Sequence, residues 1–172
     1  MSSSGKSALP SLPLRLAMAL VALALVAAPV AASDFRFVAP LSGDNEVPPV
    51  DTRATGVATF KLSGDATELS WRLIAANIQN VTQAHIHCGP EAQNGQVVLF
   101  LYGFELIEGR FQGVLSTGTA TNADIIPRPD SPVCPGGVAD LEDLIAHMRA
   151  GNAYVNVHTD QNPGGEIRAQ IR

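Results

Sequence analysis

Residues 56–74, with the sequence GVATFKLSGDATELSWRLI, hold two runs of alternating apolar and polar residues on either side of a glycine-containing turn. In the second run Leu69, Trp71 and Leu73 share one face, because successive side chains of a strand point to opposite sides of the sheet. The turn at 63–65 has residue types that reverse the chain between two strands. This stretch therefore predicts an antiparallel β-hairpin with one buried and one solvated face.

The same period-two pattern continues on both sides of this hairpin. Further strands are expected at residues 35–38, 81–88, 96–102, 109–117, 153–158 and 166–172. The strongly apolar 96–102 is expected in the centre of the sheet, and the last two strands form a closing hairpin. Residues 140–150 have helical spacing instead, with Asp140 as N-cap and Gly151 as C-terminal stop. We predict an all-β fold, an antiparallel Greek-key-like β-sandwich or flattened barrel, with one short helix near the C-terminus.

The proline- and glycine-rich segment 118–138 is expected to be a long loop. It contains Cys134, while the second of the two cysteines, Cys88, ends a predicted strand. In an oxidising compartment the simplest state of such a pair is a disulfide, which would hold this loop against the sheet. Free thiols or a thiolate metal ligand are the alternatives.

Residues 1–32 are typical of a cleavable secretory signal. Lys6 and Arg15 make the start positive, residues 16–26 are an apolar run, and residues 30–32 form a small-residue cleavage site. The run is shorter than the roughly 20 apolar residues of a membrane-spanning helix. We therefore expect residues 33–172 to be one exported domain, periplasmic or secreted, without a membrane span after signal cleavage.

The charge of this predicted domain excludes some partners. Residues 1–32 hold two of the 11 basic residues and none of the 16 acidic ones, which leaves 9 basic against 16 acidic residues. An acidic chain without a cluster of Lys or Arg is a poor match for nucleic acid or an anionic membrane. An acidic chain suits a cationic partner, such as a metal ion.

Three histidines are the candidate metal ligands. His85 and His87 alternate on a predicted strand and therefore point to the same side, and His158 lies on the outer face of a later strand. If the two strands are neighbours, the three imidazoles line one polar patch on the outside of the sheet, where they would bind copper or zinc. Asp160 is a possible fourth ligand, or a group that orients an imidazole. The alternative is independently solvated histidines, and His147 is expected on the helix surface.

Several segments together resemble a known family, the chordin-type (CHRD) domain. The similar segments are 41–50 (LSGDNEVPPV), 84–90 (AHIHCGP), 95–98 (GQVV), 151–159 (GNAYVNVHT) and 162–168 (NPGGEIR). They cover nearly all of residues 33–172, which are identified as a single CHRD domain. The resemblance implies an exported domain and assigns no activity.

A second likeness concerns the histidines. A His-x-His strand, a later histidine strand and a cysteine-tethered loop are similar to copper–zinc superoxide dismutase, in which His85, His87 and His158 would correspond to copper ligands. The bridging histidine and the zinc-ligand cluster of that enzyme are absent from this sequence, so a single copper site is the expected form.

Three functions are compatible with these patterns. The first is an exported protein that binds a metal ion, with copper expected and zinc second. The second is a non-catalytic module that binds an envelope or extracellular protein, or a glycan, through its loops. The third is a small copper redox enzyme, which would need an open coordination position. No nucleophile elbow, phosphate loop or dinucleotide fingerprint occurs, and no catalytic residue is predicted.

Overall fold

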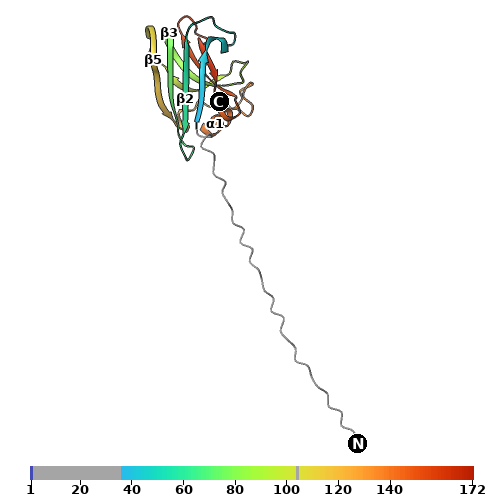
Figure 1. The fold of residues 1–172 in the computed structure, drawn as a ribbon. Helices are drawn as coiled ribbons and strands as arrows, with labels where there is room; N and C mark the ends of the chain where they lie inside the picture. The colour runs from blue at the N-terminus through green and yellow to red at the C-terminus, as the bar shows by residue number, and fades with distance from the viewer. Residues whose placement is uncertain (2–35, 104) are drawn as a thin grey trace. The chain divides into compact units, whose positions relative to one another are not determined.

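Strand β3 is the longest element of the fold. It runs from Leu69 to Cys88 and pairs with four other strands; Figure 1 shows it between β2 and β5. Its first part pairs antiparallel with β2 (Thr55–Leu62) and β5 (Ile107–Ala120). Its last part pairs antiparallel with β4 (Gln96–Tyr102) and β6 (Ala153–Thr159). Because β3 changes partners along its length, it joins the two ends of the sheet.

Two further strands complete a closed path. β1 (Arg36–Ser42) and β7 (Ile167–Gln170) lie between β2 and β6, so that the order is β2-β1-β7-β6-β3, and β2 also pairs with β3. The sheet therefore closes into a barrel. The predicted all-β antiparallel fold with one late helix is confirmed, and the barrel is the form that it takes.

The structure is a computed structural model that describes residues 1, 36–103 and 105–172. The predicted signal at 1–32 thus lies, apart from Met1, outside the described residues. The described residues from Arg36 to Arg172 belong to one compact unit. Within the described residues, no helix has the length and apolar character needed to cross a membrane.

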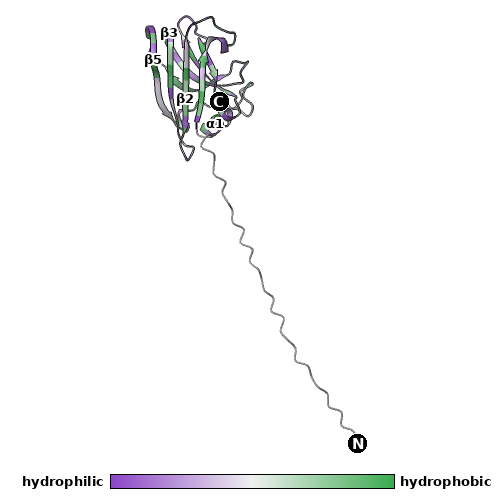
Figure 2. Ribbon diagram, viewed as in Figure 1, coloured by the Kyte–Doolittle hydropathy of each residue, from purple (hydrophilic) through white to green (hydrophobic). Residues whose placement is uncertain are grey.

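The core is made by the inward faces of the strands. Along β1, and along β2 from Ala58 onward, every second residue is buried, as the period-two pattern requires. Figure 2 shows hydrophobic positions interspersed with hydrophilic ones along the strands. The largest fully buried apolar side chains come from β2, β3, β4, β7 and the helix: Leu62, Leu69, Leu73, Ile78, Ile86, Leu99, Leu141, Leu144, Met148 and Ile167.

β3 is one strand where two were expected. The predicted break near residues 75–80 is a bend, in which Asn77 and Asn80 have φ values of 56° and 51°. Asparagine tolerates this left-handed conformation better than most residues, and the register with β5 shifts at these positions. The bend allows β3 to leave β2 and to approach β6 without ending.

Two other expectations about strands are wrong. β4 was expected in the centre of the sheet, yet within the described residues it pairs with β3 alone. β5 extends to Ala120, so residues 118–120 of the predicted loop belong to this strand. They continue its antiparallel pairing with the start of β3. The segment after β5 covers β4, since Ile126 donates its N–H to the Val98 carbonyl at 2.9 Å. An edge strand that a loop covers in this way is as apolar as a central strand, so apolar content alone does not distinguish the two.

The helix α1 (Leu141–Arg149) forms where the spacing predicts it. Asp140 is its N-cap and accepts the Asp143 N–H at 3.0 Å, and Gly151 follows it with φ of 72°. The expectation that His147 lies on the surface is wrong, because its side chain is only 9% exposed. The loop that carries Cys134 and Gly137 packs over this side of α1.

The predicted disulfide is confirmed. Cys88 at the end of β3 is bonded to Cys134, with a Cα–Cα separation of 5.7 Å. The loop has a second attachment, because Arg128 and Val138 form a bridge and the Arg128 Nε donates to the Val97 carbonyl at 3.0 Å. The disulfide therefore holds an ordered loop against the strand that carries His85 and His87.

Candidate metal centre

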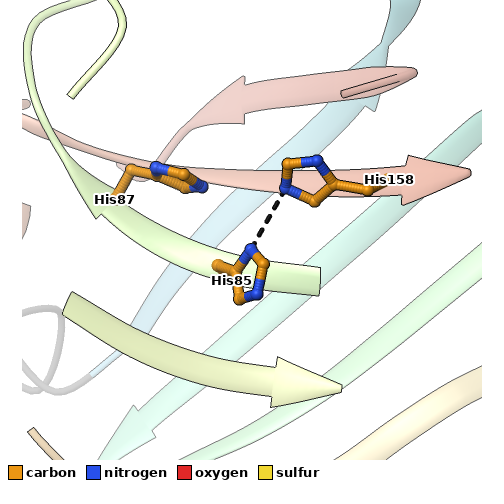
Figure 3. A group of neighbouring side chains, drawn as sticks. All are labelled: His85, His87 and His158. Carbon is orange, nitrogen blue, oxygen red and sulfur yellow. Dashed lines mark hydrogen bonds between the residues drawn. The ribbon is translucent and has the colours of Figure 1, made fainter. Parts of the chain in front are cut away.

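The two histidine-bearing strands are neighbours. β3 and β6 are antiparallel, with Gln83 opposite His158 and His85 opposite Asn156. His158 is therefore diagonal to His85, and Figure 3 shows the three rings gathered on one side of the two strands. One nitrogen from each of His85, His87 and His158 can be chosen so that all three lie within 4.8 Å of one another.

Backbone carbonyls orient two of the rings. The Nδ1 of His87 lies 3.0 Å from the Gly95 carbonyl, and the Nδ1 of His158 lies 2.9 Å from the Pro163 carbonyl. A carbonyl oxygen only accepts, so both Nδ1 atoms carry the proton, and each neutral ring keeps its lone pair on Nε2. An imidazole whose other nitrogen donates to a carbonyl is the usual arrangement of a metal-ligating histidine.

His85 completes the group. Its Nδ1 lies 3.1 Å from the Nε2 of His158, which is the contact drawn in Figure 3. Without an ion, this contact requires His85 to donate from Nδ1 to the lone pair of His158. Two nitrogens that share one ion at about 2.0–2.1 Å lie roughly 2.9–3.4 Å apart for bond angles between a right angle and the tetrahedral angle. The observed separation suits either state.

Buried atoms without partners support the fit of an ion. Within the part of the chain that the structure describes, the Nε2 atoms of His85 and His87 are buried and have no hydrogen-bond partner. A buried polar atom that is left unsatisfied costs free energy. For His87 the unpartnered atom is the one with the lone pair, so coordination would satisfy it. The residues present thus fit a transition metal with imidazole ligands.

The site is less open than predicted. His85 is 4% and His87 8% exposed, so the predicted patch on the outside of the sheet is instead a largely covered pocket of imidazoles, and independent solvation of the histidines is ruled out. Phe100 of β4 packs edge-on against the His85 ring at 4.4 Å between ring centres. The ring of Tyr154 stacks on His87 at 4.8 Å with 8° between planes.

Burial also keeps the three rings neutral. Desolvation lowers the pKa of His85 to about 3, helped by the neighbouring imidazoles of His158 and His87. Desolvation likewise lowers the pKa of His87 to about 4, although its bond to the Gly95 carbonyl opposes the shift. The pKa of His158 is lowered by burial as well. At neutral pH protons therefore do not compete with a metal ion for these nitrogens.

Asp160, the predicted fourth ligand or orienting group, lies apart from this cluster. It is exposed, its backbone N–H donates to the Asn80 carbonyl at 3.1 Å, and its carboxylate is not among the grouped ligand atoms. Asp160 follows His158 by two residues, but β6 ends at Thr159 and the chain turns there. The Pro163 carbonyl, from the same turn, takes the orienting role for His158.

The sequence analysis did not predict the residues that support His87, which are Gly95, Tyr154 and Arg168. Gly95 places its carbonyl on His87 and donates its N–H to the Tyr154 hydroxyl at 3.0 Å. A Cβ at Gly95 would stand 1.8 Å from the Cys88 carbonyl oxygen, so no other residue fits this close approach. Arg168 lies with its guanidinium carbon 3.5 Å from the centre of the Tyr154 ring. The sequence contains one signal of these groups: Tyr154 precedes His158 by four residues on a predicted strand, so both side chains point to the same face.

A second trio of ligand-type residues lies nearby. Cys88, Cys134 and His147 also bring one ligand atom each within 4.8 Å. Here the two sulfurs are bonded to each other, and His147 donates from Nε2 to the Gly137 carbonyl at 2.9 Å. The sulfurs are therefore not available as thiolates and the Nε2 of His147 carries its proton, so this trio holds the loop to α1 rather than a metal ion.

Comparison with known proteins agrees with the motifs. A family model described as the CHRD domain matches residues 37–171. The chain is 25% identical over 134 residues to chordin of Xenopus laevis, an alignment that covers 77% of this chain and 12% of chordin. No solved structure matches. Since the family model spans most of the chain, including all three clustered histidines, this protein belongs to the CHRD domain family.

Proposed function

We propose that this CHRD domain binds a transition-metal ion through His85, His87 and His158, outside the cytoplasm. The observation that carries the proposal is the convergence of three neutral imidazoles, each of which brings one ring nitrogen within 4.8 Å of the others. The buried and unpartnered Nε2 atoms of His85 and His87 support it further. A purely structural cluster would be expected to satisfy these atoms within the protein.

Copper is the favoured ion and zinc the second candidate. Imidazole nitrogens suit both metals, and the general order of affinity of divalent ions for such sites places copper above zinc. The ligand set has no carboxylate or thiolate within the described residues, so magnesium and calcium, which require oxygen ligands, are poor candidates.

The compartment is part of the proposal. A CHRD domain is found in chordin, which this chain resembles over a short part of that protein, and the predicted signal at 1–32 would direct the chain out of the cytoplasm. The buried disulfide between Cys88 and Cys134 is the expected state of two cysteines in an oxidising compartment.

Metal content and affinity of the purified protein test the proposal. The comparison is the parent against His85→Ala/His87→Ala. Asp160→Asn is the control, because it changes an exposed charge two residues after His158 and outside the cluster of ring nitrogens. We expect about one copper per chain in the parent and in the control, and none in the double variant. Equal copper binding by the parent and the double variant would refute the three-histidine site.

A second candidate function is a non-catalytic interaction module. The observation that favours it is a polar hollow of about 730 Å³ beside the bend of β3, whose lining includes Arg53, Arg110, Asn77 and Gln161. Amide and guanidinium groups of this kind suit a glycan or an acidic segment of a protein. An Arg53→Ala/Arg110→Ala variant that loses binding to the native envelope fraction, while the histidine variant keeps it, would favour this module over the metal site.

A further inference from the structure

The charge around the histidines selects among metal ions. The ligand atoms are three imidazole nitrogens, and within residues 36–103 and 105–172 no carboxylate or thiolate joins their cluster. The ligand set is therefore neutral and leaves the whole charge of the ion uncompensated. The site is also desolvated, as the burial of His85 and His87 shows. A divalent ion is then disfavoured more than a monovalent one, because the cost of burying charge rises steeply with its magnitude.

A buried cation lies behind this site. Arg168 of β7 is 1% exposed, and in the described part of the chain it forms no ion pair. Its guanidinium donates to oxygens of one loop: Asn94 Oδ1 at 2.9 Å, the Pro90 carbonyl at 3.0 Å and the Gln93 carbonyl at 2.9 Å. These partners are uncharged, so they satisfy its N–H groups without cancelling its charge, which the carboxylates of Glu46 and Glu91 offset only from a distance beyond an ion pair. Guanidinium stays protonated in proteins.

The cation is stacked in line with a metal ligand. The guanidinium carbon of Arg168 is 3.5 Å from the centre of the Tyr154 ring, and the parallel His87 ring is centred 4.8 Å from the same point. The two groups are too large to share one face of the tyrosine at these distances, so they lie on opposite faces. Arg168 is thus separated from His87 by one aromatic ring, with no room for water between them.

We infer that the three-histidine site is selective for copper(I), and that the buried Arg168 cation behind Tyr154 is the residue that sets this selectivity. The inference rests on the proposed function. Three neutral imidazoles without a fourth protein ligand leave the ion three-coordinate, which copper(I) accepts, whereas zinc and copper(II) take further ligands. The positive charge of Arg168 repels a divalent ion twice as strongly as a monovalent one.

The size of the effect follows from the stack. One charge at roughly 9 Å, at an effective dielectric of about 20, separates the affinities for a monovalent and a divalent ion by roughly tenfold or somewhat more. Arg168 also holds the loop that places Gly95 on His87, so removing it would weaken both oxidation states of copper together. The ratio of the two affinities isolates the charge from this positioning role.

The experiment measures that ratio in the purified protein. Copper(I) affinity is obtained by competition with a chromophoric copper(I) chelator under anaerobic ascorbate, and copper(II) affinity by competition with a copper(II) chelator in air. The variants are Arg168→Met, which removes the charge, and Arg168→Lys, which keeps the charge but loses the forked hydrogen bonds. Arg172→Gln is the control, because Arg172 touches the same loop through its exposed ion pair with Glu91.

We expect the parent and the control to bind copper(I) with a lower Kd than copper(II). Arg168→Met should shift the affinity ratio toward copper(II) by about tenfold, while Arg168→Lys should weaken both forms and keep the ratio. A parent that prefers copper(II), a ratio that is unchanged in Arg168→Met, or equal shifts in the methionine and lysine variants would overturn the inference while the metal site stands. A parent that binds neither form would refute the proposed function itself.

If Arg168→Met does not fold, the same ratio of copper(I) to copper(II) affinity is measured in Glu46→Gln, where a shift in the opposite direction is expected. Glu46 attracts Arg168 electrostatically. Its Oε1 also accepts a hydrogen bond from the Nδ2 of Asn156 at 2.8 Å, and Asn156 is the β6 residue that lies opposite His85. Removing this negative charge, measured at pH 8, should move the ratio toward copper(I). A shift toward copper(II), or none, would contradict the charge argument.

Discussion

Two trios of ligand-type residues lie on opposite sides of the same strand. His85 and His87 point to one side of β3 and meet His158, whereas Cys88 points to the other and meets Cys134 and His147. Both trios bring their ligand atoms within 4.8 Å. In the first trio two buried nitrogens lack hydrogen-bond partners, whereas in the second a covalent bond and a carbonyl engage the ligand atoms. Proximity of ligand types therefore does not make a metal site unless their lone pairs stay available.

Removing the disulfide should have the largest effect on stability and little on metal binding. Cys88→Ala/Cys134→Ala is expected to lower the free energy of unfolding by about 2–5 kcal/mol, since the loop and the end of β3 lose their covalent link. Chemical denaturation of the parent and the variant measures this. If the variant keeps its stability but loses copper, the two trios do not have the separate roles described above.

Removing one imidazole should have the reverse outcome. His158→Ala is expected to weaken copper binding by about 100-fold, equivalent to about 2.7 kcal/mol, with a smaller change in unfolding. Chelator competition measures the affinity and denaturation supplies the comparison. Unchanged affinity would mean that His158 is not a ligand.

Acid should destabilise the metal-free protein through the histidine trio. The lowered pKa values of His85 (about 3) and His87 (about 4) mean that the unfolded state binds more protons between those values and pH 6.5. Stability is therefore complete above pH 6.5 and falls as the pH drops toward about 4. Burial raises the pKa of Glu46 to about 7, so its contribution runs the other way, between pH 4.5 and 7, and offsets part of the loss.

The net loss from pH 6.5 to pH 5 should be about 1–2 kcal/mol, reduced by solvent screening. Unfolding curves across this range measure it in the parent and in Glu46→Gln, where the loss should be steeper. A stability that rises on acidification in Glu46→Gln would show that the imidazoles are not buried in the neutral form.

His147 should matter for the loop alone. His147→Gln removes the buried bond to the Gly137 carbonyl and is expected to cost about 1 kcal/mol of the free energy of unfolding. Copper affinity should stay within twofold of the parent. A loss of copper with His147→Gln would assign the ion to the cysteine side of β3.

The sequence predicted the hairpin of β2 and β3, the closing strands β6 and β7, and the helix, because each has a local pattern of period two or 3.6 or a local cap. It did not predict that β3 continues through Asn77 and Asn80, since a bend and a break look alike in a sequence. It placed β4 wrongly because a strand covered by a loop is as apolar as a central one. His147 was misplaced for a related reason: a distant disulfide-bound loop covers it.

The sequence alone predicted that His85 and His87 share a face and that a third histidine lies on a strand, because strand periodicity is a local property. It also predicted the disulfide, because the chain has two cysteines only. Only the tertiary structure placed β6 beside β3, covered the imidazoles, and put the Gly95 and Pro163 carbonyls on the Nδ1 atoms of His87 and His158. It alone placed Arg168 behind Tyr154. These features depend on strand order and loop paths, which are set by the summed packing of distant segments and leave no local signal.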